Sequence, residues 1–336
     1  MAYVLLVGGL ALILASCEFF TNGVEWVGRR LNLSDGAVGS VLAAVGTALP
    51  ETLVPLVAIL LKGGEAGREV GVGAILGAPF MLATVGFMVV GLGGVVYARR
   101  GIRSYHLHLA REVIRRDLRY FLMAYPLAIV LAFVPVRWPK YVLAAVLMVW
   151  YVRYVLVYLR APAPADKVDL APLHFHRRAA QGPQTWVALA QVLAATAGIV
   201  IGARIFVDGL DQAAHGLGVP RELLALVIAP VATELPEKFN SVIWMRRGRD
   251  TLALGNMTGA MVFQSCFPVA IGLCLTPWRL APWQEHVPSL ASVVLAVGSA
   301  SCLWLWLRRR QRAPAAFLLG AGILYVLFAL LVIAQL

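Results

Sequence analysis

Runs of about 20 apolar residues recur along this chain, and no other feature of the sequence restricts its fold as strongly. A hydrocarbon core roughly 30 Å thick requires about 20 helical residues, because each residue adds about 1.5 Å. Of the 336 residues, 60% are hydrophobic and 14% are charged. A soluble globular domain has about 25% charged residues. The sequence therefore predicts an all-α integral membrane protein with short loops and no soluble domain.

The apolar segments number ten, and a single loop of polar composition divides them. They cover residues 2–28, 36–61, 70–97, 120–136, 139–160, 185–214, 222–245, 252–275, 288–307 and 314–335. The loop 161–184 begins Ala-Pro-Ala-Pro and separates a first half, 1–160, from a second half, 185–336. Each half has five segments. Because five is odd, we expect the second half to insert upside down relative to the first.

The basic residues lie mostly on one side of the membrane. The loops after the first, third, fifth, seventh and ninth segments carry 20 of the 29 Lys and Arg residues, and the other loops carry six. Cytoplasmic loops are enriched in Lys and Arg. The pattern predicts a multi-pass protein with both termini outside, and it explains the net charge of +12 without nucleic acid as a partner.

The two halves share a motif. The sequence T-x-L-P-E occupies residues 47–51 and again residues 233–237, 186 positions later, each time in the second segment of its half. At this one offset the halves align without a gap from about residue 18 to about residue 60. Inverted repeats that hold a substrate site at their interface, near the bilayer midplane, are typical of transporters.

Each copy of the motif places several oxygen ligands within one helical turn. A threonine and a glutamate four residues apart share a helix face, and proline leaves the carbonyl four residues earlier without its donor. Carboxylate, hydroxyl and carbonyl oxygens are what hard cations such as Ca²⁺ bind. The alternative is that the prolines only kink the helices and the glutamates lie near the interface. The predicted ligands are Glu51, Thr47 and the carbonyl of Gly46, with Glu237, Thr233 and the carbonyl of Ala232.

The third segment of each half also has a matching pattern. Gly73 and Gly77 correspond to Gly255 and Gly259, a spacing that lets helix backbones approach closely, so the glycines serve packing or the site. Asn256 is polar at membrane depth, and we expect it to contact the site.

These motifs resemble those of the sodium/calcium exchanger (cation/calcium exchanger) superfamily. Its two repeats carry G-T/S-S-L-P-E in the second helix and G-N-x-x-G-S in the third. The resemblance implies ten helices in two inverted repeats, exchange of Ca²⁺ for Na⁺ or H⁺, and a prokaryotic inner membrane. It places Glu51 and Glu237 where the family has its two central Ca²⁺-binding carboxylates. Thr47 and Thr233 match the motif threonines.

The chain also departs from the family pattern. Family serines, asparagines or acids are replaced at Ala48, Ala74, Ala78, Leu82, Glu234, Ala260 and Gln264. Because these losses remove Na⁺ ligands, H⁺ is favoured over Na⁺ as the coupling ion. Glu234 lies one turn before Glu237, and two close carboxylates suit a proton carrier. Glu234 is therefore an extra ligand or a proton carrier.

Several other polar residues have more than one predicted role. Lys238 is expected to point away from Glu237, toward a carboxylate on another helix or toward a helix end. Glu18 and Arg204 occupy equivalent positions and form an ion pair or lie solvated. The pairs His106/His108 and His174/His176 are ordinary loop histidines or bind a transition metal.

The sequence raises three functional hypotheses. The leading hypothesis is a secondary antiporter for Ca²⁺ or another divalent cation, with no permanently bound cofactor and no partner beyond the bilayer and inorganic cations. The second is a non-transporting relative in which a Lys–Glu ion pair replaces the cation. An enzyme is excluded, because the helices contain no Ser–His pair or HExxH motif.

Overall fold

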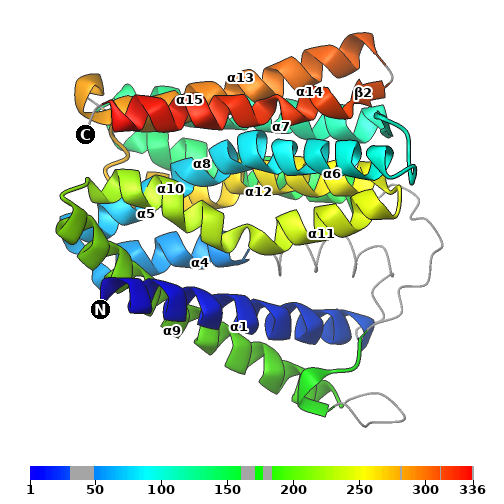
Figure 1. Cartoon of the computed structure of the whole chain (residues 1–336). Helices are drawn as coiled ribbons and strands as arrows, with labels where there is room; N and C mark the ends of the chain where they lie inside the picture. The colour runs from blue at the N-terminus through cyan, green and yellow to red at the C-terminus, as the bar shows by residue number, and fades with distance from the viewer. Residues whose placement is uncertain (31–48, 160–170, 177–183, 281, 311, 335–336) are drawn as a thin grey trace.

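A computed structural model of the chain describes residues 1–30, 49–159, 171–176, 184–280, 282–310 and 312–334 (Figure 1). In the first half the helices are α1 (Ala2–Arg30), α4 (Leu49–Val57), α5 (Gly64–Met81), α6 (Phe87–Arg99), α7 (Arg111–Val130) and α8 (Trp138–Leu159). In the second half they are α9 (Thr185–Leu217), α10 (Arg221–Thr233), α11 (Leu235–Arg246), α12 (Asp250–Leu275), α13 (Val287–Arg309), α14 (Ala315–Leu319) and α15 (Ala321–Ile333). Helix is present in each of the ten predicted segments, so the all-α class is confirmed.

Short elements complete the chain. Two π-helical turns, η2 (Ala58–Lys62) and η3 (Leu82–Gly86), extend α4 and join α5 to α6. The described residues also form the 3₁₀ turns η4 (Leu131–Phe133), η5 (His174–His176) and η6 (Trp283–His286), and the short strands β1 (His106–His108) and β2 (Arg312–Pro314). The chain begins, and α15 ends, at the same end of the bundle (Figure 1). This arrangement is what an even number of membrane crossings requires.

Within the described residues, seven helices are individually long and apolar enough to cross a membrane. They cover Ala2–Val27, Gly64–Arg99, Trp138–Val157, Thr185–Leu217, Asp250–Leu275, Trp283–Arg309 and Ala315–Ile333. The other three predicted segments differ for separate reasons. Part of 36–61 lies outside the described residues, α7 carries four arginines in its first turns, and α10 is separated from α11 at Glu234.

Helices of one half pack closely on helices of the other through glycine. A Cβ added to Gly77 of α5 would lie 2.0 Å from the carbonyl oxygen of Leu226 in α10, and one on Gly73 would lie 2.2 Å from the carbonyl oxygen of Glu222. These two glycines are thus needed for close backbone approach. Gly255 and Gly259 have no such neighbour, since their nearest atoms would be 3.8 and 3.4 Å away.

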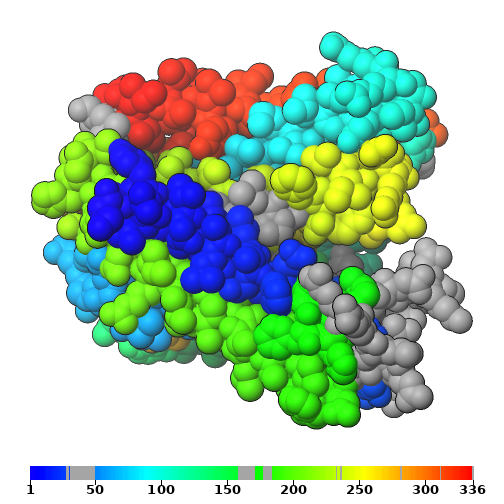
Figure 2. All heavy atoms as spheres, turned by 60° about the horizontal axis from the view of Figure 1, so that its bottom comes forward, coloured from blue at the N-terminus to red at the C-terminus, as the bar shows by residue number. Residues whose placement is uncertain are grey.

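The helices α1 and α9 form a pair along one edge of the molecule (Figure 1). Figure 2 turns this edge forward and shows both helices at the surface. A Cβ on Gly9 would lie 2.6 Å from the backbone nitrogen of Phe206, and one on Gly209 would lie 2.7 Å from that of Leu6. Small residues therefore bring these two backbones together, as in other membrane helix pairs.

The loops that carry the basic residues are joined at the opposite end. Strand β1 pairs antiparallel with β2, so that His106 lies opposite Pro314 and His108 opposite Arg312. Arg103 in the same loop forms a buried ion pair with Asp250 at the start of α12. His106 and His108 are thus part of a ribbon that connects three loops, and their side chains are exposed.

The turn η5 lies against α1 and α9. Nε2 of His174 is 3.4 Å from Oε1 of Glu18, and Gln191 of α9 donates a hydrogen bond to Oδ1 of Asn22 over 3.0 Å. Glu18 is therefore placed with His174, and no pair between Glu18 and Arg204 is among the ion pairs of the described residues.

Candidate functional site

Three buried glutamates lie near the junction of the two halves. The exposed fractions are 4% for Glu51 on α4, 0% for Glu234 and 2% for Glu237 on α11. Glu51 interacts electrostatically with Glu237 most strongly, then with Glu234. Glu51 and Glu237 also both act on Cys17, which α1 contributes. The two motif glutamates, 186 residues apart in the chain, are thus neighbours in space.

The second motif does not lie in a continuous helix. The helix α10 ends at Thr233, Glu234 has φ −89° and ψ 9°, and α11 begins at Leu235 with Pro236 in its first turn. Proline is well tolerated there, because its missing N–H has no partner at a helix start. The sequence predicted that Pro236 frees the carbonyl of Ala232, and the break at Glu234 is how the chain accommodates it. Glu237 lies in the first turn of α11, at the positive end of the helix dipole.

A small cavity adjoins Glu51. Its lining comes from α4, α5 and α10, namely Glu51, Val54, Pro55, Ala74, Ala78, Ala229, Pro230 and Thr233. Its volume is about 10 Å³, close to the roughly 10–15 Å³ that one water requires. Space of this size suits a single dehydrated ion or water rather than an organic substrate.

Thr233 and Glu51 present oxygen atoms at this cavity. The hydroxyl of Thr233 donates to the carbonyl of Ala229 over 3.1 Å, which leaves its lone pairs for another partner. Both carboxylate oxygens of Glu51 are buried without a hydrogen bond from the described residues. Burying an unpaired carboxylate is costly, so such a group normally binds a proton or a cation.

The partner of Lys238 is a carboxylate one turn away in the chain. Its Nζ lies 2.9 Å from Oε2 of Glu234, one turn earlier in the chain, with 11% of the lysine side chain and none of the glutamate side chain exposed. Of the two predicted directions, a carboxylate on another helix is wrong. The ammonium lies instead toward the start of its own helix, because residues four apart share a face there. The side chain of Gln264 in α12 lies beside the same carboxylate.

Asn256 lies near the site but contacts the backbone. Its side-chain amide donates to the carbonyl oxygen of Glu237 over 3.2 Å. Leu82 in η3 is fully buried. Thr47, Gly46 and Ala48 lie outside the described residues, and Ala232 is described only by its backbone.

No group of three or more His, Cys, Asp or Glu side chains that could hold a metal ion occurs among the described residues. A transition-metal site at the histidine pairs therefore has no third ligand of these types there. A cation at Glu51 and Glu237 would depend on hydroxyl and carbonyl oxygens for its remaining ligands, as the motif predicts. Ligands of this mixed oxygen type are those of Ca²⁺.

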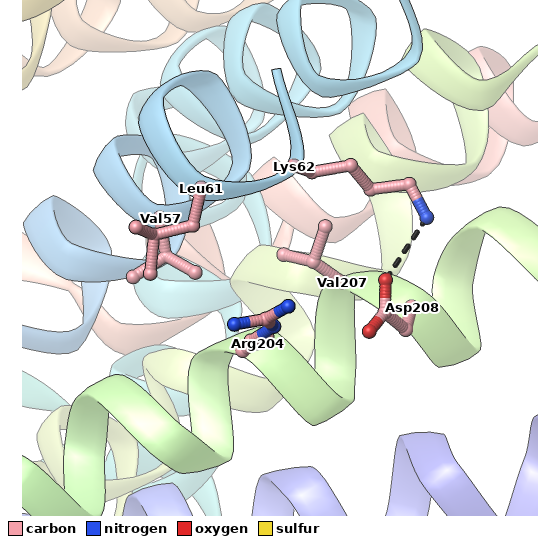
Figure 3. A pocket seen from close by; sticks show the side chains of 6 residues that line it. All are labelled: Val57, Leu61, Lys62, Arg204, Val207 and Asp208. Carbon is pink, nitrogen blue, oxygen red and sulfur yellow. Dashed lines mark hydrogen bonds and ion pairs between the residues drawn. The ribbon is translucent and has the colours of Figure 1, made fainter.

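A larger pocket opens farther along α4, and sequence reasoning did not find it. Figure 3 shows Val57, Leu61 and Lys62 facing Arg204, Val207 and Asp208 of α9. The pocket that these side chains line has a volume of about 220 Å³. Nζ of Lys62 lies 3.0 Å from Asp208 and 2.8 Å from Asp211. We call this the vestibule. The sequence signal was the pair of aspartates three apart in an apolar segment, which marks one polar face.

Ion pairs continue from the vestibule to the next helices. Arg221 at the start of α10 forms ion pairs with Asp211 of α9 and with Glu69 of α5. Arg204 makes no ion pair or hydrogen bond among the described residues, and its side chain is exposed at the pocket. The α1–α9 pair is therefore tied to the other helices by charges at this end.

Comparisons with known proteins agree with this architecture. The family described as "Sodium/calcium exchanger protein" matches residues 1–160 and 187–336. The "Putative antiporter CaxA" of Alkalimonas amylolytica is 26% identical over 332 residues, which cover 96% of this chain and 97% of that protein. The "Inner membrane protein YrbG" of Escherichia coli is 23% identical over 350 residues, covering 97% and 96%.

Two solved structures have the same fold. An H⁺/Ca²⁺ exchanger named CAX superposes with a TM-score of 0.68 at 19% identity, over 99% of this chain and 88% of that one. The sodium-calcium exchanger NCX_Mj superposes with a TM-score of 0.60 at 19% identity, over 100% of this chain and 98% of that one. The ten-helix fold expected from the sequence is thus confirmed.

Proposed function

We propose that this chain, which belongs to the sodium/calcium exchanger family, exchanges Ca²⁺ or a similar divalent cation for H⁺ or Na⁺. The chain is a membrane transporter of cations and not an enzyme. The observation that carries the proposal is the carboxylate of Glu51, buried without a hydrogen-bond partner in the described residues and close to Glu237 across the two halves. The charges of these two carboxylates match that of one divalent ion.

The remaining ligands follow from the same turn. Thr233 lines the cavity beside Glu51, and the carbonyl of Ala232 lacks an i+4 donor because Pro236 has no N–H. By the repeat, Thr47 and the carbonyl of Gly46 would contribute from the first half. The carrier would alternate its access to this site by movement of one helix group against the other.

The coupling ion we favour is H⁺. The positions that provide polar ligands in sodium-coupled relatives are Leu82 and Gln264, and Leu82 is fully buried and apolar. Two carboxylates that release a divalent cation can take up protons in its place.

The E. coli relative is named an inner membrane protein, and we extend that location to this chain, with both termini outside.

A second function is supported by a different observation. Lys238 and Glu234 form a buried ion pair beside the glutamates, as expected for a relative in which an internal ion pair replaces the transported cation. Such a protein would keep the fold and bind no cation. The two functions differ in whether cations stabilise the folded protein.

Melting temperatures of the detergent-solubilised chain test both functions. We expect CaCl₂ or MnCl₂ to raise the melting temperature of the wild type, and Glu51→Gln and Glu237→Gln to abolish the rise. Glu65→Gln is the matched control, because Glu65 is exposed and is not among the groups that act on Glu51. No rise with any cation would favour the non-transporting relative.

Flux in proteoliposomes then identifies the exchange. We expect Ca²⁺ uptake driven by an H⁺ gradient and lost in both glutamine variants. Uptake driven by a Na⁺ gradient alone would instead assign Na⁺ as the coupling ion. If Ca²⁺ uptake persisted unchanged in both variants, the assignment of Glu51 and Glu237 would be wrong.

A further inference from the structure

We infer that the ammonium group of Lys238 acts as a tethered cation at Glu234, filling a second cation subsite so that the divalent ion binds with no Na⁺ beside it. The inference rests on the proposed function and specifies its ion selectivity. It assigns Lys238 as a specificity-determining residue, in place of the purely structural ion pair of the alternative function.

The subsite has the oxygen atoms that a monovalent cation would use. Glu234 is fully buried, and its Oε1 has no hydrogen bond from the described residues. The side chain of Gln264 lies beside this carboxylate as a hydrogen-bond donor, and its own Oε1 is buried without a hydrogen bond from the described residues. One carboxylate oxygen, Oε2, receives the Lys238 ammonium at 2.9 Å. A positive charge thus already lies against the buried carboxylate that a second cation would need.

The repeat shows that this charge pair is an addition to one half. At the offset of 186 residues, Glu234 corresponds to Ala48 and Lys238 to Thr52, so the first half has neither charge. The pair adds no net charge to the site. Two negative charges, those of Glu51 and Glu237, remain for the transported ion, whereas Glu234 without Lys238 would leave three.

The charge of Lys238 reaches the principal carboxylate. Lys238 is among the groups that act electrostatically on Glu51, together with Glu237 and Glu234. A second mobile cation at Glu234 would therefore meet an ammonium already in contact with its ligand. Coulomb repulsion between like charges in a poorly solvated site is strong, so Na⁺ is excluded while Lys238 is in place.

Removing the ammonium should make the melting temperature depend on Na⁺, which we call the Na⁺ response. We would titrate NaCl against the melting temperature of the detergent-solubilised full chain, with choline chloride for equal ionic strength. In Lys238→Gln, Na⁺ should stabilise the protein at concentrations about tenfold or more below any effect on the wild type. In Glu234→Gln/Lys238→Gln the response should disappear, because the carboxylate ligand is gone.

Lys140→Gln is the matched control. Lys140 is also a buried lysine, but it donates to the carbonyls of Pro277 and Trp278 and frees no carboxylate when replaced. No Na⁺ response is expected in this variant. A response equal to that of Lys238→Gln would overturn the inference, as would a response that persists in the double variant or no response in Lys238→Gln.

A second variant applies if Lys238→Gln does not fold. Glu234→Gln keeps the ammonium without its partner, and repulsion should weaken the Ca²⁺ response about tenfold or more. An unchanged Ca²⁺ response would overturn the inference. The proposed function is tested by a different result: it fails if no divalent cation raises the melting temperature of the wild type. The Na⁺ titration of Lys238→Gln can still be measured in that case, so the two failures are distinguishable.

Discussion

Asn256 and Glu237 are joined by a hydrogen bond in which the asparagine side-chain amide donates to the glutamate backbone carbonyl over 3.2 Å. The helix α12 thereby holds the first turn of α11, which carries the second motif glutamate. The bond reaches the backbone rather than the carboxylate. This bond makes Asn256 a positioning residue for Glu237, and its predicted contact with the site stays a prediction.

Replacing Asn256 by alanine tests this role. One hydrogen bond contributes about 0.5–1.5 kcal/mol, so Asn256→Ala should weaken Ca²⁺ binding by roughly tenfold or less. Glu237→Gln should abolish binding. Ca²⁺ titrations monitored by the melting temperature compare the two variants. A loss in Asn256→Ala as complete as that in Glu237→Gln would make Asn256 a ligand.

Gly77 should tolerate no larger residue. In Gly77→Ala the new Cβ would lie 2.0 Å from the carbonyl oxygen of Leu226, so α5 and α10 must move apart. Overpacking of this kind costs about 1–3 kcal/mol or more, and the melting temperature should fall. Gly298→Ala in α13 is the control, because a Cβ there meets no atom within 4 Å. An equal or smaller loss in Gly77→Ala than in Gly298→Ala would contradict the close approach.

Lys62 should stabilise the vestibule over a wide pH range. Burial lowers the pKa of Lys62, but hydrogen bonds to Asp211 and Asp208 outweigh burial and raise the pKa above its ordinary value of 10.5. A raised lysine pKa gives stability that is fully present below 10.5 and is lost as the pH rises through the folded value. Lys62→Met should therefore lower the melting temperature by the same amount at about pH 6 and about pH 9.

Above the ordinary lysine pKa the difference between Lys62→Met and the wild type should shrink. Both proteins would be melted in matched buffers of constant ionic strength, with Arg68→Met as the control for loss of an exposed positive charge nearby. A difference that already disappeared between about pH 6 and about pH 9 would show that the ammonium does not supply this stability.

The pair of Arg103 and Asp250 should matter more than pairs at the surface. Only 7% of the arginine and 2% of the aspartate side chain is exposed, and both oxygens of Asp250 accept from the guanidinium. Asp250→Asn leaves a buried, unpaired positive charge, which costs about 3–5 kcal/mol. Glu112→Gln removes an exposed partner of Arg115 and should cost under about 1 kcal/mol. Chemical denaturation gives the free energy of unfolding of both variants. Equal losses in Asp250→Asn and Glu112→Gln would contradict the greater stabilisation by the buried pair.

Much of the architecture was predictable from local properties of the chain. Each apolar segment must form a helix in lipid, because no solvent is present to bind its backbone groups. The repeated motif placed Glu51 and Glu237 together, since an inverted repeat brings equivalent residues to one interface. The contacts of Lys238, Glu18 and Asn256 were not predictable, because each depends on where a helix ends or which helix lies beside it.

The break between Thr233 and Leu235 illustrates the difference. Pro236 predicts a disturbed helix, but proline is compatible with a kink or with a new helix start. The structure has a new start, which places Glu237 in a first turn and Lys238 on the face of Glu234. The vestibule likewise joins Lys62 to Asp208, which is 146 residues away in the chain, and to Asp211 one turn later.

The sequence by itself determined the membrane class, the ten helical segments and the paired glutamates, because hydrophobic length and repetition are properties of the chain alone. Tertiary structure decided which charges compensate one another. It placed Lys238 against Glu234 and left both carboxylate oxygens of Glu51 without a hydrogen bond from the described residues. The physical reason is that an ion pair needs its charged atoms within about 4 Å of each other, a distance that only the packing of the helices sets.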